Sequence, residues 1–150
     1  MSGIISAIRG GPDSQANIEL GIDLARKKRL PLYFLYVVNL DFMIHTESSR
    51  IQTISEEMWE MGDFILTEAR TQAEAEGVKA EGVVRKGKIG EEILKLCKEL
   101  EADYVTFGRP RGKGEADFFT HPGLMQLGKR IETETDVEVV YVKEESVDEA

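Results

Sequence analysis

The sequence at residues 3–14, GIISAIRGGPDS, predicts a strand, a tight turn and the start of a helix, in that order. The nearly continuous apolar run Gly3–Ile8 is typical of a strand that is covered on both faces. Asp13 or Ser14 is a suitable N-cap, and apolar residues then recur at helical spacing. This order of elements opens an α/β unit with a parallel sheet.

The same succession repeats along the chain. Further strands are predicted at Leu32–Val38, Val78–Val84, Asp103–Phe107 and Val137–Val142, with a helix before each. The run at 78–84 is the most polar of them, which favours an edge position. Because crossovers between parallel strands are right-handed, the helices must cover both faces of one open sheet. We therefore predict an α/β fold with one domain over residues 1–143 and an acidic, solvated tail over residues 144–150.

The second expected helix is long and amphipathic. A capping box near Ser49 opens it and Gly77 ends it. Its predicted inner side carries Ile51, Ile54, Met58, Ile65 and Ala69. Trp59 and Met61 of the same helix are interpreted as packing or a partner surface. In the third helix, Cys97 falls on the apolar stripe and is predicted to be core, not a nucleophile.

Composition limits the classes of function. The 150 residues carry a net charge of −9, which disfavours binding to nucleic acid or to anionic lipid. No apolar run approaches the roughly 20 residues of a membrane span. The single cysteine excludes an internal disulfide and fits a reducing compartment, so the cytoplasm is the expected location.

Two loops at the carboxyl ends of predicted strands combine glycine with positive charge. The first is Arg9-Gly10-Gly11, and the second contains Gly108, Arg109, Arg111 and Gly112. Ligands of open parallel sheets bind beyond the carboxyl ends of the strands, where the strand order reverses. Glycine amides, helix N-termini and arginine side chains together favour an anion there. Ordinary tight turns with surface arginines are the alternative interpretation of both loops.

No catalytic or metal-binding set is predicted. His45 and His121 lie far apart in polar loops, with no cysteine or histidine at metal-ligand spacing. Glu56, Glu57 and Glu60 form an acidic helix surface and not a recognisable acid–base pair.

Residues 102–108, ADYVTFG, follow an amphipathic helix and resemble the universal stress protein family. The resemblance extends over nearly the whole chain. It implies a five-stranded sheet of order 3-2-1-4-5, related to the adenine nucleotide alpha hydrolases. It also implies a homodimer formed through the fifth strand, and ATP bound between the first and fourth strands with little or no turnover.

The glycine motif of that family, Gly-x2-Gly-x9-Gly followed by Ser or Thr, is altered in this chain. Gly108 matches the first glycine, whereas Arg111 occupies the second position and Gly112 follows one place later. Gly123 takes the third position and Leu124 replaces the hydroxyl residue. After the first strand, Arg9 stands where nucleotide-binding members usually carry Asp. Val38 matches the position whose backbone often meets adenine. The candidate nucleotide or anion site is therefore Ala7, Arg9, Gly10, Gly11, Val38, Gly108, Arg109, Arg111, Gly112 and Gly123.

Three hypotheses of function follow. The first is a stress-type regulatory module that binds ATP, another adenine nucleotide or a different phosphate-bearing ligand. The second is a dimeric interaction protein of the same fold that has lost its ligand and works through its dimer surface and second helix. The third is a small ATP-using enzyme, since residues 10–14, GGPDS, resemble part of the pyrophosphatase loop of N-type ATP pyrophosphatases.

Overall fold

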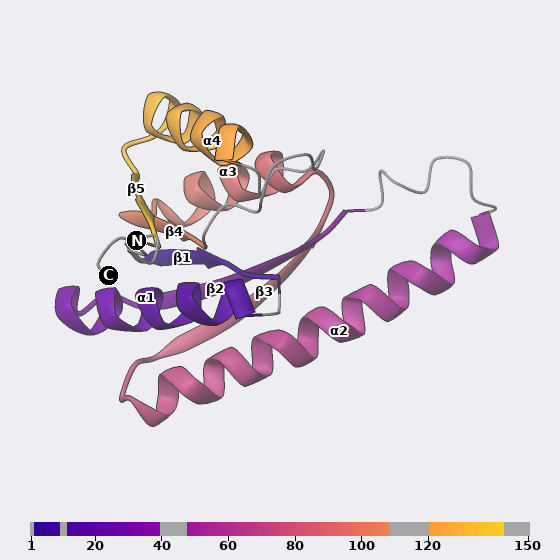
Figure 1. Ribbon diagram of the computed structural model, residues 1–150, viewed down its shortest axis with the longest axis horizontal. Coiled ribbons are helices and arrows are strands. Elements are labelled where there is room, and N and C mark those ends of the chain that lie inside the picture. Colours follow the sequence, from indigo (N-terminus) through magenta and orange to yellow (C-terminus); the bar gives the residue numbers. More distant parts are fainter. Residues whose placement is uncertain (1, 10–11, 40–47, 109–120, 143–150) are drawn as a thin grey trace, which may run out of the picture.

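The computed structural model describes residues 2–9, 12–39, 48–108 and 121–142. Within these ranges strands and helices alternate from β1 to β5, as Figure 1 shows. The strands are β1 (Ile4–Ala7), β2 (Leu32–Val38), β3 (Ala80–Lys86), β4 (Tyr104–Phe107) and β5 (Glu138–Tyr141). All four pairings are parallel, and the order is β3-β2-β1-β4-β5. The predicted fold class and strand order are confirmed, as is the edge position of the third strand.

Two pairs of helices cover the sheet. The helices are α1 (Pro12–Lys28), α2 (Ser48–Ala75), α3 (Ile89–Leu100) and α4 (His121–Glu134). In Figure 1, α1 and α2 lie on one face of the sheet, and α3 and α4 lie on the other. Each pair covers its own cluster of buried apolar side chains, centred on residues such as Phe34 and Ile22 on the first face and Phe107 and Ile93 on the second. None of the described helices is both long and apolar enough to cross a membrane.

The third strand begins two residues later than predicted. Gly77 adopts a left-handed φ of 78°, and the Val78 amide donates to the Ala73 carbonyl at 2.9 Å. Residues 76–78 therefore close the end of α2, as expected for a left-handed helix terminus. Because Val78 belongs to this turn, it cannot also pair in the sheet, and β3 starts at Ala80.

Helix α2 packs closely on the sheet through a glycine. A Cβ atom on Gly62 would overlap the ring of Tyr36 on β2, so only glycine allows this approach. The buried residues of α2 include Leu66 and Ala73, which the sequence analysis did not place inside. Ile54, Met58 and Ile65 are only half-buried, because the inner face is rotated from the predicted one.

Candidate functional site

The strand order reverses between β1 and β4, and these two strands separate at their carboxyl ends. Their ladder ends at the pair Ser6↔Thr106, whereas β1 continues beside β2 to the pair Ala7↔Leu35. The amide of Ile8 still donates to the Leu35 carbonyl at 2.9 Å. Beyond this point β1 stays with β2 while β4 departs. A fork therefore opens where ligands of open parallel sheets bind.

Asn17 of α1 fills the base of this fork. Its side-chain Nδ2 donates to the Ala7 carbonyl at 2.8 Å and to the Thr106 carbonyl at 3.3 Å. Asn17 is only 1% exposed, and its Oδ1 atom has no hydrogen-bond partner among the residues that the structure describes. One side chain thus joins the ends of both strands to the first turns of α1.

A pair of buried hydroxyl groups lies directly below Asn17 and the fork. The Ser6 and Thr106 hydroxyl oxygens are 2.6 Å apart, and neither residue is exposed. A Cβ atom on Gly21 of α1 would come closer than 3.0 Å to the Ser6 hydroxyl. The helix can therefore rest on this pair only because residue 21 is glycine. Polar bonds, in addition to apolar contacts, fix α1 over the β1–β4 junction.

The turn after β1 is closed by a helix side chain. The buried Ser14 hydroxyl accepts a hydrogen bond from the Arg9 amide at 2.9 Å. Pro12 stands at the first position of α1, where a missing N–H costs nothing. This bond holds the backbone of Arg9 near the N-terminus of α1, where a helix favours an anion.

The described part of the chain holds some predicted site residues at this edge. Ala7 ends β1, Arg9 lies two residues after it, and Gly108 follows β4. Gly123 lies in the first turn of α4, and the site's remaining residues Gly10, Gly11, Arg109, Arg111 and Gly112 lie outside the described residues. The tail at 144–150 also lies outside them.

Val38 ends β2 and is fully buried. Its backbone carbonyl accepts a hydrogen bond from the Gly87 amide at 3.0 Å. This bond uses one lone pair of a carbonyl oxygen at the position whose backbone, by the family resemblance, often meets adenine. A base at this position has to share the carbonyl with Gly87.

Shifts of pKa among the described residues have structural causes. Burial raises the pKa of the Cys97 thiol to about 12, which confirms Cys97 as a core residue. A hydrogen bond from Arg85 lowers the pKa of Glu99, and one from Arg130 lowers the pKa of Glu91. Both ion pairs lie on exposed surface and hold α3 to β3 and α4. Within the described ranges there is no group of three or more His, Cys, Asp or Glu residues able to hold a metal ion.

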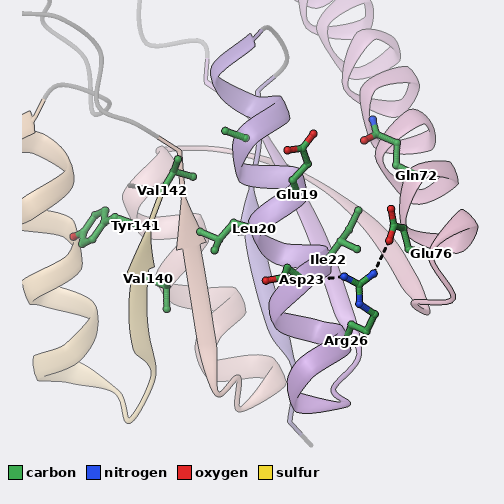
Figure 2. Close-up of a pocket in the computed structure, with 11 residues that line it drawn as sticks. Glu19, Leu20, Ile22, Asp23, Arg26, Gln72, Glu76, Val140, Tyr141 and Val142 are labelled. Carbon is green, nitrogen blue, oxygen red and sulfur yellow. Dashed lines mark hydrogen bonds and ion pairs between the residues drawn. The ribbon is translucent and has the colours of Figure 1, made fainter. Parts of the chain in front are cut away.

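A groove of about 690 Å³ follows the outer side of α1, away from the fork. Figure 2 shows α1 between Val140–Val142 on the β5 side and Gln72 and Glu76 on the α2 side. Arg26 spans the lower part of the groove and pairs with Asp23 and Glu76. None of the predicted site residues that the structure describes lines this groove. Asp23, Arg26 and Glu76 pair with one another there, and Glu19 accepts a hydrogen bond from Gln15, so the groove does not replace the fork as the candidate site.

Comparison with known proteins decides the family. The profile of the Universal stress protein family matches residues 1–127. The chain belongs to the universal stress protein family. No curated protein matches it.

Solved structures of this family share the fold. The universal stress protein UspA from Lactobacillus plantarum superposes with a TM-score of 0.76 at 13% identity, over 95% of this chain and 97% of the other. An Archaeoglobus fulgidus universal stress protein in complex with dAMP gives a TM-score of 0.59 at 15% identity, over 95% and 98%. A universal stress protein in complex with cAMP gives 0.60 at 16% identity, over 94% and 95%. At these identities the similarity establishes the fold alone.

Sequence analysis missed the polar residues that build the fork of this universal stress protein. Asn17, Ser6 and Thr106 are short polar side chains within otherwise apolar segments. The available signal was the position of Asn17 one residue before Ile18, on the side of α1 that faces the sheet. A polar residue at such a position must find a buried partner.

Proposed function

We propose that this universal stress protein is a regulatory module that binds an adenine nucleotide or another phosphate-bearing ligand at the β1–β4 fork without significant turnover. The observation that carries the proposal is the fork itself. Strand order reverses there, the strand ends diverge, and Arg9 and Gly108 follow the two strands. Family members crystallised with dAMP and cAMP support an adenine nucleotide as the ligand class.

Positive charge and backbone amides favour an anion at this edge. Arg9 has its backbone fixed beside the first turn of α1, and the sequence supplies Arg109 and Arg111 after β4. Arginine pairs with phosphate oxygens through two parallel hydrogen bonds. In a chain of net charge −9, such a cluster concentrates attraction for a negative ligand at one place.

We also propose a cytoplasmic homodimer that pairs through β5. The Glu138 and Val142 amides donate to the Asp103 and Phe107 carbonyls, so the Val139 amide points away from β4, where it donates to a carboxylate oxygen of Glu132 at 3.3 Å. Val139 and Tyr141 are half-buried, as expected of residues at an edge that a partner can extend. A partner strand at this edge would replace the contact of the Val139 amide with Glu132 by a backbone hydrogen bond.

A thermal-shift series with ATP, AMP, dAMP, cAMP, adenosine and inorganic phosphate tests the ligand proposal. A ligand at one hundred times its dissociation constant stabilises the folded chain by about 2.7 kcal/mol. For a domain of this size that corresponds to a rise in Tm of about 5–10 °C. No shift with any of these ligands would refute ligand binding and favour the interaction protein of the same fold.

Charge variants locate the site. Changing Arg9 and Arg111 together to Ala is expected to abolish the shift, because both phosphate partners are lost. The matched control changes Arg70 of α2 and Lys79 of the following turn, both exposed, to Ala, and this variant should keep the thermal shift. A full shift in the Arg9/Arg111 variant would place the ligand elsewhere. Pyrophosphate release from ATP in the presence of an acceptor would instead support the small ATP-using enzyme.

A further inference from the structure

Helix α2 carries an apolar pair that faces solvent. Phe64 is 64% exposed and Met61 is 57% exposed. They are three residues apart, so their side chains are neighbours on the helix surface. Gly62 contacts Tyr36 of the sheet, and at 100° per residue Phe64 points about 200° away from it. Isolated apolar residues on a surface are ordinary, but an adjacent phenylalanine and methionine pointing away from the core form a patch.

Acidic residues surround this pair. Glu57 lies four residues before Met61, and Glu60 and Glu68 lie four residues to either side of Phe64. We call Glu57, Glu60, Met61, Phe64 and Glu68 the outer face of α2. All five residues are exposed.

The part of the helix around this pair has no basic residue of its own. Between Arg50 and Arg70 the sequence has five acidic residues and no lysine or arginine. Near the end of α2, Glu74 pairs with Arg70, and Glu76 of the following turn pairs with Arg26. The outer face is therefore both apolar at its centre and negatively charged at its rim.

Most of the outer face lies away from the other helix on the same side of the sheet. Gln15, near the start of α1, bonds Gln72, and Arg26 bonds Glu76, so α1 meets the last turns of α2. Figure 1 shows the first half of α2 extending past α1. A partner can approach this half of α2 without displacing α1.

We propose that the outer face of α2 is a docking surface for a basic amphipathic helix of another protein. An amphipathic helix lays its apolar stripe on an apolar surface, with anchors spaced by three and four residues. Phe64 and Met61 supply the apolar contact, and methionine adapts its shape to different anchors. Lysine or arginine beside the partner's stripe would face Glu57, Glu60 and Glu68.

Charge selects this occupant over a second copy of the chain. Two outer faces packed together would place carboxylates opposite carboxylates, which is destabilising. The docking surface does not depend on nucleotide binding at the fork, so the two proposals can fail separately.

The test measures binding of a labelled, tryptophan-free lysine–leucine peptide by fluorescence anisotropy, with leucines at i, i+3, i+4 and i+7. A peptide of the same composition in scrambled order is the control for charge alone. We expect the patterned peptide to bind at least about tenfold more tightly than the scrambled one. Equal binding of the two would overturn the proposal.

Variants place the peptide on α2. Changing Phe64 and Met61 together to Ser should weaken binding by about tenfold or more, because aromatic anchors dominate such contacts. Met125 on α4 is 49% exposed, and Met125→Ser is the matched control with no expected effect. Circular dichroism should show all variants folded, since the changed side chains are exposed. Equal affinity of the Phe64/Met61 variant and wild type would overturn the assignment.

Charge variants and oligomeric state complete the test. Glu57→Gln with Glu60→Gln should weaken binding at low salt and have little effect at high salt, since exposed charges are screened. The control pair Glu81→Gln and Glu138→Gln removes the same charge from exposed positions on strands. A change in sedimentation of the Phe64/Met61 variant without peptide would show that a second copy occupies the face, and would overturn the proposal.

Discussion

Replacing Gly21 by Ala should destabilise the protein, although alanine is the better helix former. Gly21 lies within α1, where Gly→Ala normally gains about 1 kcal/mol of helix stability. The new Cβ would come closer than 3.0 Å to the Ser6 hydroxyl oxygen. That oxygen is buried and bonded to the Thr106 hydroxyl at 2.6 Å, so it cannot rotate away without losing its partner.

The size of the effect follows from these opposing terms. If Ser6 stays in place, overpacking the core typically costs about 1–3 kcal/mol; if its side chain rotates away instead, breaking the buried hydroxyl bond costs a similar amount. After subtracting the helix gain, we expect a net loss of about 1 kcal/mol. In a Ser6→Ala background the clashing oxygen is gone, and the nearest remaining atoms are 3.3–3.4 Å away. There Gly21→Ala should instead stabilise the protein by up to about 1 kcal/mol.

A double-mutant cycle measures this change of sign. Urea unfolding of wild type, both single variants and the double variant, followed by far-UV circular dichroism, gives the coupling free energy between positions 6 and 21. We expect a coupling of about 1–3 kcal/mol. The loss of the Ser6–Thr106 bond occurs in both Ser6→Ala proteins and cancels. An equal effect of Gly21→Ala in both backgrounds would refute the described packing of α1 on the β1–β4 junction.

Three further changes test other parts of the structure. Asn17→Ala removes the donor to two buried carbonyls, so we expect the free energy of unfolding to fall by about 2 kcal/mol in urea titrations. An unchanged midpoint of urea unfolding would contradict the described hydrogen bonds of Asn17. Burial raises the pKa of Cys97 to about 12, so only about one thiol in 10⁴ is ionised at pH 8. The native protein should therefore resist a thiol reagent that labels the unfolded chain at once. Rapid labelling of the native protein would show that Cys97 is accessible. Val139→Pro removes an amide that points away from β4 and donates to Glu132, so sedimentation should show a folded monomer, whereas Val140→Pro should disrupt the ladder itself. A dimer that survives Val139→Pro would exclude pairing through β5.

Local patterns predicted most of the elements, and their errors have physical reasons. The apolar run ending at Ile8 and the turn signals after it predicted β1 and α1, because burial on both faces leaves a continuous signal. The strand order came from the family resemblance, since periodicity does not say which strands are neighbours. Leu66 was not assigned to the core because the long pattern of α2 allows a rotation of its inner face.

The candidate site was less predictable than the fold. Glycine and arginine marked the loops, but the residues that hold the strand ends are Asn17, Ser6 and Thr106. Their role depends on where two strands separate, which is a property of the folded sheet and not of either segment. Phe64 likewise belongs to an amphipathic pattern whose direction became clear only when Gly62 was found against the sheet.

Hydrogen bonding at the carboxyl edge indicates what kind of ligand it can hold. The carbonyls of Ala7 and Thr106 accept from Asn17, and the carbonyl of Val38 accepts from Gly87. Each of these acceptors already has one donor, so a ligand that mainly donates hydrogen bonds or carries positive charge would have to share them. The groups that the sequence adds around the fork are arginines and glycine amides, which are donors. Acceptor-rich phosphate oxygens match these donors better than a purine does. Phosphate should therefore contribute more of the binding free energy than the base, and adenosine should give a much smaller thermal shift than ATP.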